Sequence, residues 1–573
     1  MLVTLINWIY IFLTSYIIGF FVLPRISGLI VKGCSPSFNW CDRVVAGLVI
    51  ATVYAQIFSL FSGLGIAANV VMVIFCLTAA YIDRNRIKEE LILRRKVAGD
   101  TTPRKIIRAL LVVIGAVLFV LNLMYTADSS FHYDTGLYHA QSIHWLEDYG
   151  IIKGLGLIHV RLAYNSAYYP LCALYSMRDL MGGQSLHGMS GFISMILCMY
   201  AVYGWIRKCD AVSACIRLAP VFYFLICLLE ITSPESDFVT IFLFIWMMIR
   251  LAEVGHSTDE DNRLAGLCLL AICSFSLVGF KLSAAGFALV TIWPLVILIK
   301  KRQWKSIILC GCLAAMMVLP YVIRNVIICG WPVYPFAHFD MFDVPWKFAK
   351  ETLESDANEI GVWAGLVHSE GAGGGSMIEW LRYWWDEQVL AARLFVSSFL
   401  LSLPVAVVCV FIRSKWFFKY LMAVMLASIV FYLIKAPLIR YGYGPVLVFP
   451  LMTMGFVLEA SMGSKKAVAI FISVFVSAVI LLPSLYSTKE LLKFDIEESG
   501  RFSFSNHLIR QIDYPAANVR EVDWYGHTVY LPNKGDQCWY YAFPSSPYHE
   551  CFDNNMPISD DLADGVIRTD SIR

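Results

Sequence analysis

The chain of 573 residues is 58% hydrophobic and only 15% charged, and its mean hydropathy is +0.66. Ordinary soluble domains carry roughly a quarter charged residues, so this composition excludes a soluble globular protein and predicts an all-α polytopic membrane protein. The formal net charge of +2, without a long basic tract interleaved with aromatic residues, predicts no nucleic-acid partner.

Apolar runs long enough to cross a bilayer, roughly 17–25 residues, recur from one end of the chain to the other. They predict about fourteen transmembrane helices, near residues 3–23, 44–63, 66–82, 106–124, 185–205, 212–231, 238–254, 264–280, 283–300, 306–328, 391–412, 417–435, 444–461 and 466–483. These helices are expected to form a bundle in contact with membrane lipids.

Basic residues gather in alternate loops of this pattern. The loop 83–108 is rich in Lys and Arg and is therefore expected to be cytoplasmic. Counting spans from this loop places residues 125–184, residues 329–390 and the tail 484–573 on the extracytoplasmic face. We therefore expect a multi-pass protein of the inner (plasma) membrane whose active site faces the periplasm or the exterior.

This topology divides the chain into five parts. They are N-terminal transmembrane helices with a basic cytoplasmic loop (1–105), a core that includes the extracytoplasmic loop 125–184 (106–328), an extracytoplasmic loop (329–390), C-terminal transmembrane helices (391–483) and a small extracytoplasmic C-terminal domain (484–573). The C-terminal domain contains Tyr, Trp and Pro but no span, and we expect it to be β-rich. Cys538 and Cys551 are expected to form a disulfide if this domain faces an oxidising compartment.

Asp134 lies at the mouth of a membrane span, because it soon follows the apolar run 106–124. Charges near hydrocarbon are costly and usually functional. Helical spacing places Asp134, Tyr138, Gln141 and Trp145 on one stripe, which predicts an interfacial helix lying on the membrane. The alternative is a helix that only caps the bundle, with Asp134 as its N-cap.

The region after this span has a recognisable order. An Asp is followed by two short surface helices and by a Pro-Leu pair that opens a segment closing at Gly; the residues are Asp134, Tyr138, Pro170, Leu171 and Gly182–Gly183. This order resembles the first large extracytoplasmic loop of the GT-C membrane glycosyltransferases, which include the protein mannosyltransferases and the lipid A aminoarabinose transferases. The resemblance implies a GT-C-like bundle with interfacial helices in this loop. It also implies that a sugar is transferred, with inversion, from a polyprenyl-phosphate-linked donor to a glycan, lipid or protein acceptor on the extracytoplasmic face.

Cofactor use stays open at this point. Many members of these families have paired acidic residues where this chain has Asp134 and Thr135, so dependence on a divalent Mg or Mn ion is undecided. His139 and His144 are five residues apart, which is not the spacing that presents two ligands to one zinc ion from a helix. We therefore predict no zinc site from these histidines.

The chemistry of inverting transfer assigns roles to the charged residues. One carboxylate must accept the proton of the acceptor hydroxyl, whereas a phosphate leaving group departs without the general acid that a hydrolase requires. Asp134 is therefore the predicted catalytic base. Cations must hold the donor phosphate, and the candidates on the same face are Lys281, Arg440 and Arg324. The alternative for each cation is a side chain that only extends to the lipid headgroups.

Other side chains of this face are expected to contact the sugar or the acceptor, because aromatic faces suit sugar C–H surfaces and polar groups suit sugar hydroxyls. The predicted substrate-binding residues are Tyr138, His139, Gln141, Asn165, Asp237, Asn325 and Tyr334. Asp237 as a simple helix-start carboxylate and Tyr334 as part of an interfacial aromatic belt are the alternatives.

Two other functions are compatible with the sequence. A polysaccharide polymerase or ligase also uses outer-face Arg residues and a long outer loop, on polyprenyl-diphosphate-linked glycans. A lipid-linked-glycan flippase, or another transporter, favours polar groups near the middle of the membrane and two related halves. Here the ionisable residues gather at one face and no internal repeat is evident.

Overall fold

The structure is a computed structural model. It describes residues 1–34, 36–93, 102–207, 209–363, 377–412, 414–435, 437–462 and 508–572, together with the single positions 467, 470 and 471.

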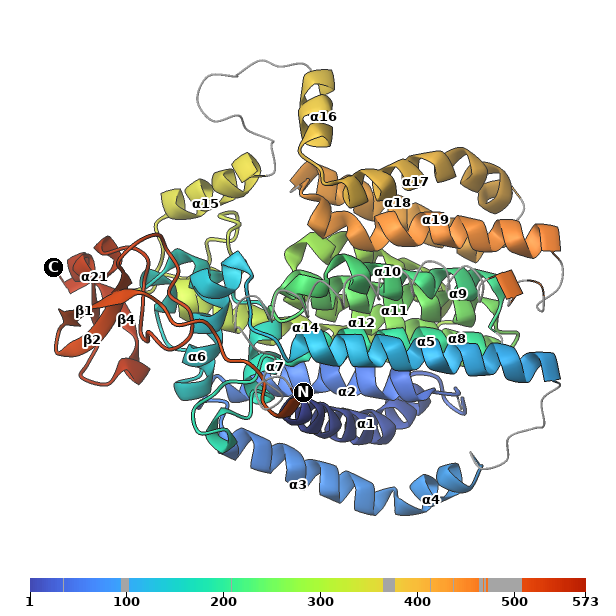
Figure 1. Ribbon diagram of the computed structural model, residues 1–573, viewed down its shortest axis with the longest axis horizontal. Coiled ribbons are helices and arrows are strands. Elements are labelled where there is room, and N and C mark those ends of the chain that lie inside the picture. The colour runs from blue at the N-terminus through green and yellow to red at the C-terminus, as the bar shows by residue number, and fades with distance from the viewer. Residues whose placement is uncertain are drawn as a thin grey trace.

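A bundle of long apolar helices forms most of the molecule (Figure 1). Among the described residues, 11 helices are long and apolar enough to cross a membrane, or 12 if a pair bent by 71° counts as one span. The bundle helices are α1 (Leu2–Ile30), α2 (Trp40–Phe58), α3 (Ile66–Ile82) with α4 (Arg84–Leu93), α5 (Thr102–Thr126), α8 (Met189–Arg207), α11 (Ser236–His256), α12 (Glu260–Phe280), η6 (Leu282–Thr291) with α13 (Ile292–Lys300), α14 (Trp304–Cys329), α17 (Leu390–Ala406) with η7 (Val407–Ile412), α18 (Trp416–Lys435) and α19 (Ile439–Met462). The all-α polytopic fold is thereby confirmed.

The predicted span 212–231 differs from the others. It is divided into two short helices, α9 (Ala211–Ile216) and α10 (Leu218–Ile226), with Arg217 between them. The Arg217 guanidinium is buried and binds the Glu253 carboxylate and the Tyr200 carbonyl. The interruption cannot be read from the pattern of apolar residues, because the charge of Arg217 is neutralised by Glu253 of α11. The predicted span 466–483 lies almost entirely outside the described residues.

Between α5 and α8 the chain forms a compact cap on one end of the bundle. Its elements are short: η1 (Thr135–His139), α6 (Ala140–Asp148), η2 (Leu155–Leu157), η3 (Val160–Tyr164), α7 (Tyr168–Leu174) and η4 (Arg178–Leu180). The predicted helix that contains Trp145 is present, but it does not lie open on a membrane surface, since residues Thr135–Glu147 are buried. The C-terminal domain covers it, so its helical stripe packs against protein.

The described part of the C-terminal domain is β-structured, as expected. Strands β1 (Val519–Trp524) and β2 (His527–Pro532) form an antiparallel hairpin, and β3 (Asn555–Pro557) pairs with β4 (Val566–Arg568). Tyr525 and Gly526 join the hairpin, both with positive φ, which matches the twist of a two-residue turn. Cys538 and Cys551 are free thiols, so the expected disulfide is not formed; Cys538 is buried instead.

Direct contacts join this domain to the cap. The Gly136 carbonyl accepts hydrogen bonds from the backbone N–H groups of Cys538 and Trp539, both at 2.8 Å. His144 stacks against the rings of Tyr540 and Phe543, with centroid distances of 4.3 and 3.8 Å. A Cβ added at Gly136 would lie 2.8 Å from the Trp539 ring, so only glycine permits this close approach. In Figure 1 the domain, drawn in red, accordingly lies against α6 at one end of the bundle.

After α14 the chain leaves the bundle at Gly330, which has a φ of 80°. It then forms α15 (Lys350–Trp363) and, after residues outside the described part, α16 (Met377–Asp386). Both helices lie near the same end of the bundle as the cap (Figure 1). The predicted loop 329–390 thus contains helices, and α15 contributes to the cavity described next.

Candidate functional site

A cavity opens at the end of the bundle that carries the cap. It contains about 1320 Å³ of empty space, including the part open to solvent. Its walls come from distant parts of the chain: the cap, the start of α11, the break between α12 and η6, α14, α15 and the start of α19. The charged and aromatic residues that line it are Asp134, Tyr138, His139, Arg161, Tyr164, Tyr169, Glu235, Phe280, Lys281, Tyr321, Tyr334, Phe336, Phe431, Arg440 and Tyr441.

Asp134 occupies the position before the first residue of η1, a single π-helical turn, and its side chain makes no capping hydrogen bond within the described part of the chain. A hydrogen bond between the Thr135 and Ser233 hydroxyls, 2.8 Å apart, holds the turn in place. The carboxylate of Asp134 lines the cavity and is partly exposed. The alternative role as a helix cap is therefore not what the structure shows.

Two more carboxylates come from the start of α11. Glu235 and Asp237 are both buried, and the extended backbone of Glu235 precedes the first turn of the helix. Burial, followed by the neighbouring Asp237 charge, raises the pKa of Glu235 well above its ordinary value. Glu235 is therefore held protonated to higher pH than a free Glu, which limits the negative charge on this wall.

Two cations face these acids. The Lys281 Nζ lies 2.9 Å from Asp237 Oδ1 and 4.4 Å from the centroid of the Tyr441 ring. Burial is the largest single effect and lowers the pKa of Lys281, but the Asp237 charge together with Tyr441 and Glu235 outweighs it, and the net change is upward. Lys281 is placed here because α12 ends at Phe280 and Lys281 adopts an extended backbone.

Arg440, in the first turn of α19, bridges all three acids. Its Nη1 lies 3.7 Å from Asp134 Oδ2 and 3.6 Å from Glu235 Oε1, and its Nε lies 3.7 Å from Asp237 Oδ2. These separations exceed those of good hydrogen bonds. The guanidinium therefore balances charge while leaving N–H groups that a ligand anion can engage.

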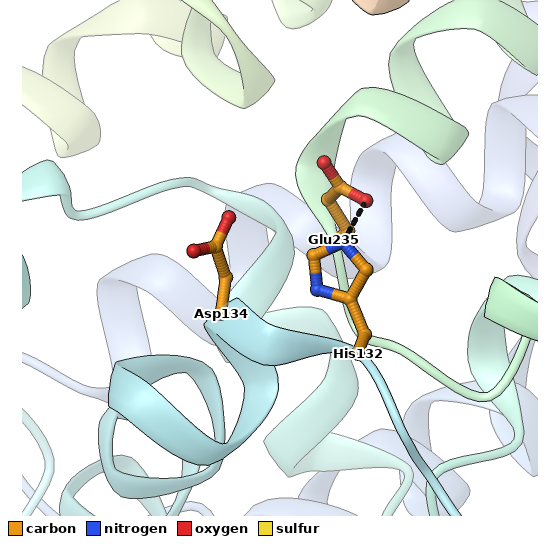
Figure 2. Close-up of side chains that lie close together, drawn as sticks. All are labelled: His132, Asp134 and Glu235. Atoms are coloured by element: carbon orange, nitrogen blue, oxygen red, sulfur yellow. Dashed lines mark ion pairs between the residues drawn. The ribbon is translucent and has the colours of Figure 1, made fainter. Parts of the chain in front are cut away.

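His132 completes the polar wall (Figure 2). Its Nε2 lies 3.2 Å from Glu235 Oε2, and its ring stacks at 6.0 Å on that of His139. Burial is the main cause that lowers the pKa of both histidines, which keeps them neutral. Neutral imidazole is the form that binds a metal ion.

Figure 2 also shows the residues that could hold a metal ion, His132, Asp134 and Glu235. One ligand atom from each lies within 4.8 Å of the others. One imidazole nitrogen and two carboxylate oxygens favour Mn²⁺ or another first-row ion over Mg²⁺, which prefers oxygen ligands alone. The donor set fits a divalent ion.

The chain matches the family model described as "Domain of unknown function (DUF8201)" over residues 1–447. The protein belongs to this family. No curated protein and no solved structure matches the chain significantly. The part that matches the DUF8201 model contains every residue that lines the cavity and ends before the C-terminal domain.

The structure brings together most of the site residues predicted for this DUF8201 protein. Asp134, Lys281, Arg440, Tyr138, His139 and Tyr334 line the cavity, and Asp237 contacts both cations directly. These residues are separated by up to 306 positions in the sequence numbering. Their convergence required only that several spans end at the same end of the bundle.

Four predicted residues neither line the cavity nor contact its cations. Gln141 donates its amide to the carbonyls of Trp539 and Ala542, so it holds the C-terminal domain rather than a substrate. Asn165 donates to Asn325 Oδ1 at 2.8 Å, and Asn325 donates to the Pro332 carbonyl. Asn165 and Asn325 thus fix the backbone behind the cavity wall. Their assignment as substrate-binding residues is corrected accordingly.

Arg324 is the fourth. It is 1% exposed, and its Nη1 reaches Gln56 Oε1 of α2 at 3.5 Å. A side chain this deeply packed between helices is reached neither by a donor phosphate in the cavity nor by lipid headgroups. Both the predicted role in phosphate binding and its alternative are therefore wrong.

Sequence reasoning missed several contributors to the cavity, among them Arg161, Tyr164 and Tyr441. Arg161 gave a signal, because it is the only Asp, Glu, His, Lys or Arg residue besides His159 between Leu155 and Tyr169. Nothing local marks Tyr441, which places its ring against Lys281. His132 was not among the predicted site residues.

Proposed function

We propose that this protein is an integral membrane glycosyltransferase that transfers a sugar from a polyprenyl-phosphate-linked donor to an acceptor outside the cytoplasm. One observation carries the proposal: a carboxylate at the mouth of the bundle, Asp134, shares an aromatic cavity with two cations, Lys281 and Arg440. A carboxylate can accept a proton there, and the cations can bind a phosphate at the point where a lipid tail would leave for the bilayer.

In this proposal Asp134 is the base. The acceptor hydroxyl gives its proton to the Asp134 carboxylate while its oxygen attacks the anomeric carbon of the donor sugar. The bond between that carbon and the phosphate oxygen breaks, and the polyprenyl phosphate leaves with the electron pair. A carboxylate that makes no capping hydrogen bond and is partly exposed to the cavity suits proton transfer of this kind.

Lys281 and Arg440 would hold the donor phosphate. Arg440 makes only loose contacts of 3.6 to 3.7 Å with the three acids, so a phosphate can take its N–H groups at small cost. Lys281 is bound more tightly, at 2.9 Å from Asp237, and Asp237 thereby fixes its position. Charge-assisted hydrogen bonds to phosphate are among the stronger polar contacts.

His132, Asp134 and Glu235 are the residues that would hold a divalent ion in this cavity. Such an ion would act as a Lewis acid that stabilises negative charge on the departing phosphate. Arg440 contacts the carboxylates of Asp134 and Glu235. An ion bound there would therefore leave Arg440 available to the donor.

A polymerase or ligase that uses a polyprenyl-diphosphate-linked glycan is the second candidate. It is favoured by a third cation, Arg161, in the lining of the same cavity, because a diphosphate carries more charge than a monophosphate. A flippase is disfavoured, since the charged residues of the cavity lie where helices begin or end and not in their middle. Examples are Lys281 directly after α12 and Arg440 in the first turn of α19.

The test combines a deletion strain with purified full-length protein. Mass spectrometry of the polyprenyl lipids of the deletion strain is expected to show an accumulated sugar-linked polyprenyl monophosphate. The purified protein should consume this lipid, and Asp134→Asn should abolish its turnover. Asp523→Asn, an exposed carboxylate of β1, is the matched control and should retain full activity.

Two results would contradict the proposal. Turnover by the Asp134→Asn variant at the rate of the unchanged protein would remove the base. Accumulation of an oligosaccharide linked to polyprenyl diphosphate, without a monophosphate-linked sugar, would favour the polymerase or ligase instead.

A further inference from the structure

A second polar centre adjoins the cavity: Arg161 and Tyr164 line it, and Asp356 pairs with both from behind the wall. Arg161 belongs to η3 and Asp356 to α15, and the Arg161 Nη1 lies 3.4 Å from Asp356 Oδ1. The Tyr164 hydroxyl donates to the same Oδ1 at 3.2 Å. Arg161 and Asp356 are both buried. A donor-rich guanidinium of the cavity wall is thus held beside an acceptor carboxylate that lies directly behind the wall.

Aromatic rings connect this centre to the Asp134 centre. Tyr138 lies between them: its ring centroid is 4.4 Å from that of His139 and 5.7 Å from that of Tyr164. The Tyr164 ring in turn lies 5.8 Å from that of Tyr334. All four side chains line the cavity. A ligand that extends from Asp134 to Arg161 would therefore lie along tyrosine rings.

Two polar atoms of the second centre have unused hydrogen-bonding capacity. Asp356 Oδ2 and the Tyr334 hydroxyl are buried and face each other, but neither makes a well-formed hydrogen bond within the described part of the chain. The side chains are 4% and 2% exposed, respectively. Burial raises the pKa of both groups, and their proximity to each other contributes for Tyr334. Buried polar atoms of this kind normally have a partner, which points to a ligand.

The backbone segments that carry these side chains are held in place by further contacts, so the centre is preorganised. Asn165 follows η3 with a φ of 44° and is bound to Asn325, which holds the Pro332 carbonyl two residues before Tyr334. On the other side, Leu353 anchors α15 with 0% exposure. The second pair of Arg161, with Glu359 Oε1 at 2.9 Å, lies at the surface.

We propose that Arg161, Tyr164, Tyr334 and Asp356 bind a saccharide, so that the acceptor of the proposed transfer is a glycan. The role of this saccharide as an acceptor rests on the proposed function, whereas the saccharide-binding site does not. Vicinal sugar hydroxyls both donate and accept: Asp356 Oδ2 accepts a hydroxyl hydrogen, and the Tyr334 hydroxyl and Arg161 donate to hydroxyl oxygens. The C–H face of the sugar ring packs on Tyr164 and Tyr138.

This placement orients the acceptor for reaction. A sugar residue held at Arg161 and Asp356 presents its next residue along Tyr138 toward Asp134. The hydroxyl nearest Asp134 is the one whose proton the carboxylate removes, and its oxygen forms the new bond to the donor sugar as the phosphate leaves. The second centre touches the acceptor away from the reacting atoms, so it controls acceptor affinity and choice of hydroxyl.

The first experiment measures binding without catalysis. Full-length protein in lipid nanodiscs is mixed with methyl glycosides of a hexose, a 6-deoxyhexose and an N-acetylhexosamine, or with a Ser- and Thr-containing peptide, and contacts are read by saturation-transfer difference NMR. We expect signals from at least one glycoside. They should be lost in Asp356→Asn and weakened in Tyr334→Phe, but kept in Asp134→Asn.

Glu359→Gln is the matched control, because it removes the exposed half of the Arg161 pairing and leaves Asp356 in place. It should retain saccharide binding. Equal loss in Glu359→Gln and in both Asp356→Asn and Tyr334→Phe would mean that the contacts only anchor α15, and the proposal would be overturned. Signals from the peptide and none from any glycoside would overturn it in favour of a protein acceptor.

The second experiment uses turnover, with the donor isolated from the deletion strain and the strain's own surface glycan as acceptor. Tyr334→Phe removes one hydroxyl and is expected to raise the KM for acceptor about threefold to tenfold, with the KM for donor unchanged. An unchanged acceptor KM in both Tyr334→Phe and Asp356→Asn would refute the assignment. If saccharide binding depends on Asp356 but the protein shows no donor turnover, the proposed function is refuted and the saccharide site is not.

Discussion

The Lys281 ammonium lies 2.9 Å from Asp237 Oδ1 and joins the break between α12 and η6 to the first turn of α11. Asp237 is 4% exposed and Lys281 26% at their side chains. An ion pair so situated contributes little net energy as a pair, but removal of one partner leaves a buried charge uncompensated. The pair therefore also fixes the position of the Lys281 ammonium in the cavity.

We expect Lys281→Met to lower the free energy of unfolding, by up to about 3–5 kcal/mol, because the buried Asp237 then keeps only its looser contact with Arg440 at 3.7 Å. The double variant Lys281→Met, Asp237→Leu should recover most of this loss while staying inactive, since the cation is absent. The measurement is the midpoint of thermal unfolding in detergent, with donor turnover in parallel. A double variant no more stable than the single one would show that the two side chains are not energetically coupled.

Sequence alone predicted much of the bundle and the core of the site for understandable reasons. Long apolar runs fix helix positions within a few residues, as for α5 and α12. Basic loops indicate which helix ends share a face. Asp134, Lys281 and Arg440 all lie at such ends, so their meeting in one cavity followed from topology without knowledge of any contact.

The errors have a different origin. Gln141 shares a helical stripe with Asp134, but one face of a helix also packs against whatever covers it, here the backbone of Trp539 and Ala542. Arg324 was placed near a membrane surface by its position in the span, whereas its side chain turns to Gln56. Arg161 pairs with Asp356 across 195 positions of the sequence. Tertiary contacts of this kind are not encoded in local spacing.

Metal binding should depend on pH through Glu235. Burial and Asp237 raise the pKa of Glu235, and an ion requires its carboxylate form. The affinity for Mn²⁺ should therefore still increase with pH above the ordinary pKa of Glu, about 4.3, with release of one proton from Glu235. His132 adds no dependence above its ordinary pKa, because burial lowers its pKa and it is already neutral there.

Electron paramagnetic resonance of added Mn²⁺ across this pH range measures the effect. Glu235→Gln should bind Mn²⁺ weakly and with little pH dependence, since the amide does not titrate. Glu521→Gln is a suitable control, because this exposed carboxylate of β1 lies outside the set His132, Asp134 and Glu235. Mn²⁺ affinity that falls with rising pH, or that is unchanged in Glu235→Gln, would exclude the site.

The contact between Gly136 and the C-terminal domain should be sensitive to one methyl group. A Cβ at Gly136 would lie 2.0 Å from Gln537 Oε1 and 2.8 Å from the Trp539 ring, and the Gln537 side chain can move more easily than the ring. Gly136→Ala is expected to destabilise the protein by about 1–3 kcal/mol. It should also reduce turnover, because η1 carries Asp134 at its start.

Thermal unfolding and limited proteolysis of the C-terminal domain measure this prediction. Gly311→Ala is the control, because a Cβ at Gly311 in α14 meets nothing within 4 Å and alanine favours a helix by roughly 0.5–1 kcal/mol. Early cleavage of the domain is expected in Gly136→Ala only. Equal behaviour of the two variants would show that the domain does not depend on this close contact.

The side of the membrane on which the cavity opens decides whether a lipid-linked donor outside the cytoplasm can reach Asp134. Asp553, in the C-terminal domain, and Asp261, at the start of α12, are both exposed, and α12 runs from Asp261 to the cavity residue Lys281. A helix of this length, 21 residues, spans about 30 Å, so the two positions lie at opposite ends of the bundle.

With an impermeant maleimide on intact cells, Asp553→Cys should be labelled and Asp261→Cys should not, beyond the background of the native cysteines. Lysed cells should give labelling of both. The reverse pattern in intact cells would place Asp134, Lys281 and Arg440 on the cytoplasmic side, where the donor and acceptor proposed for this cavity are not presented.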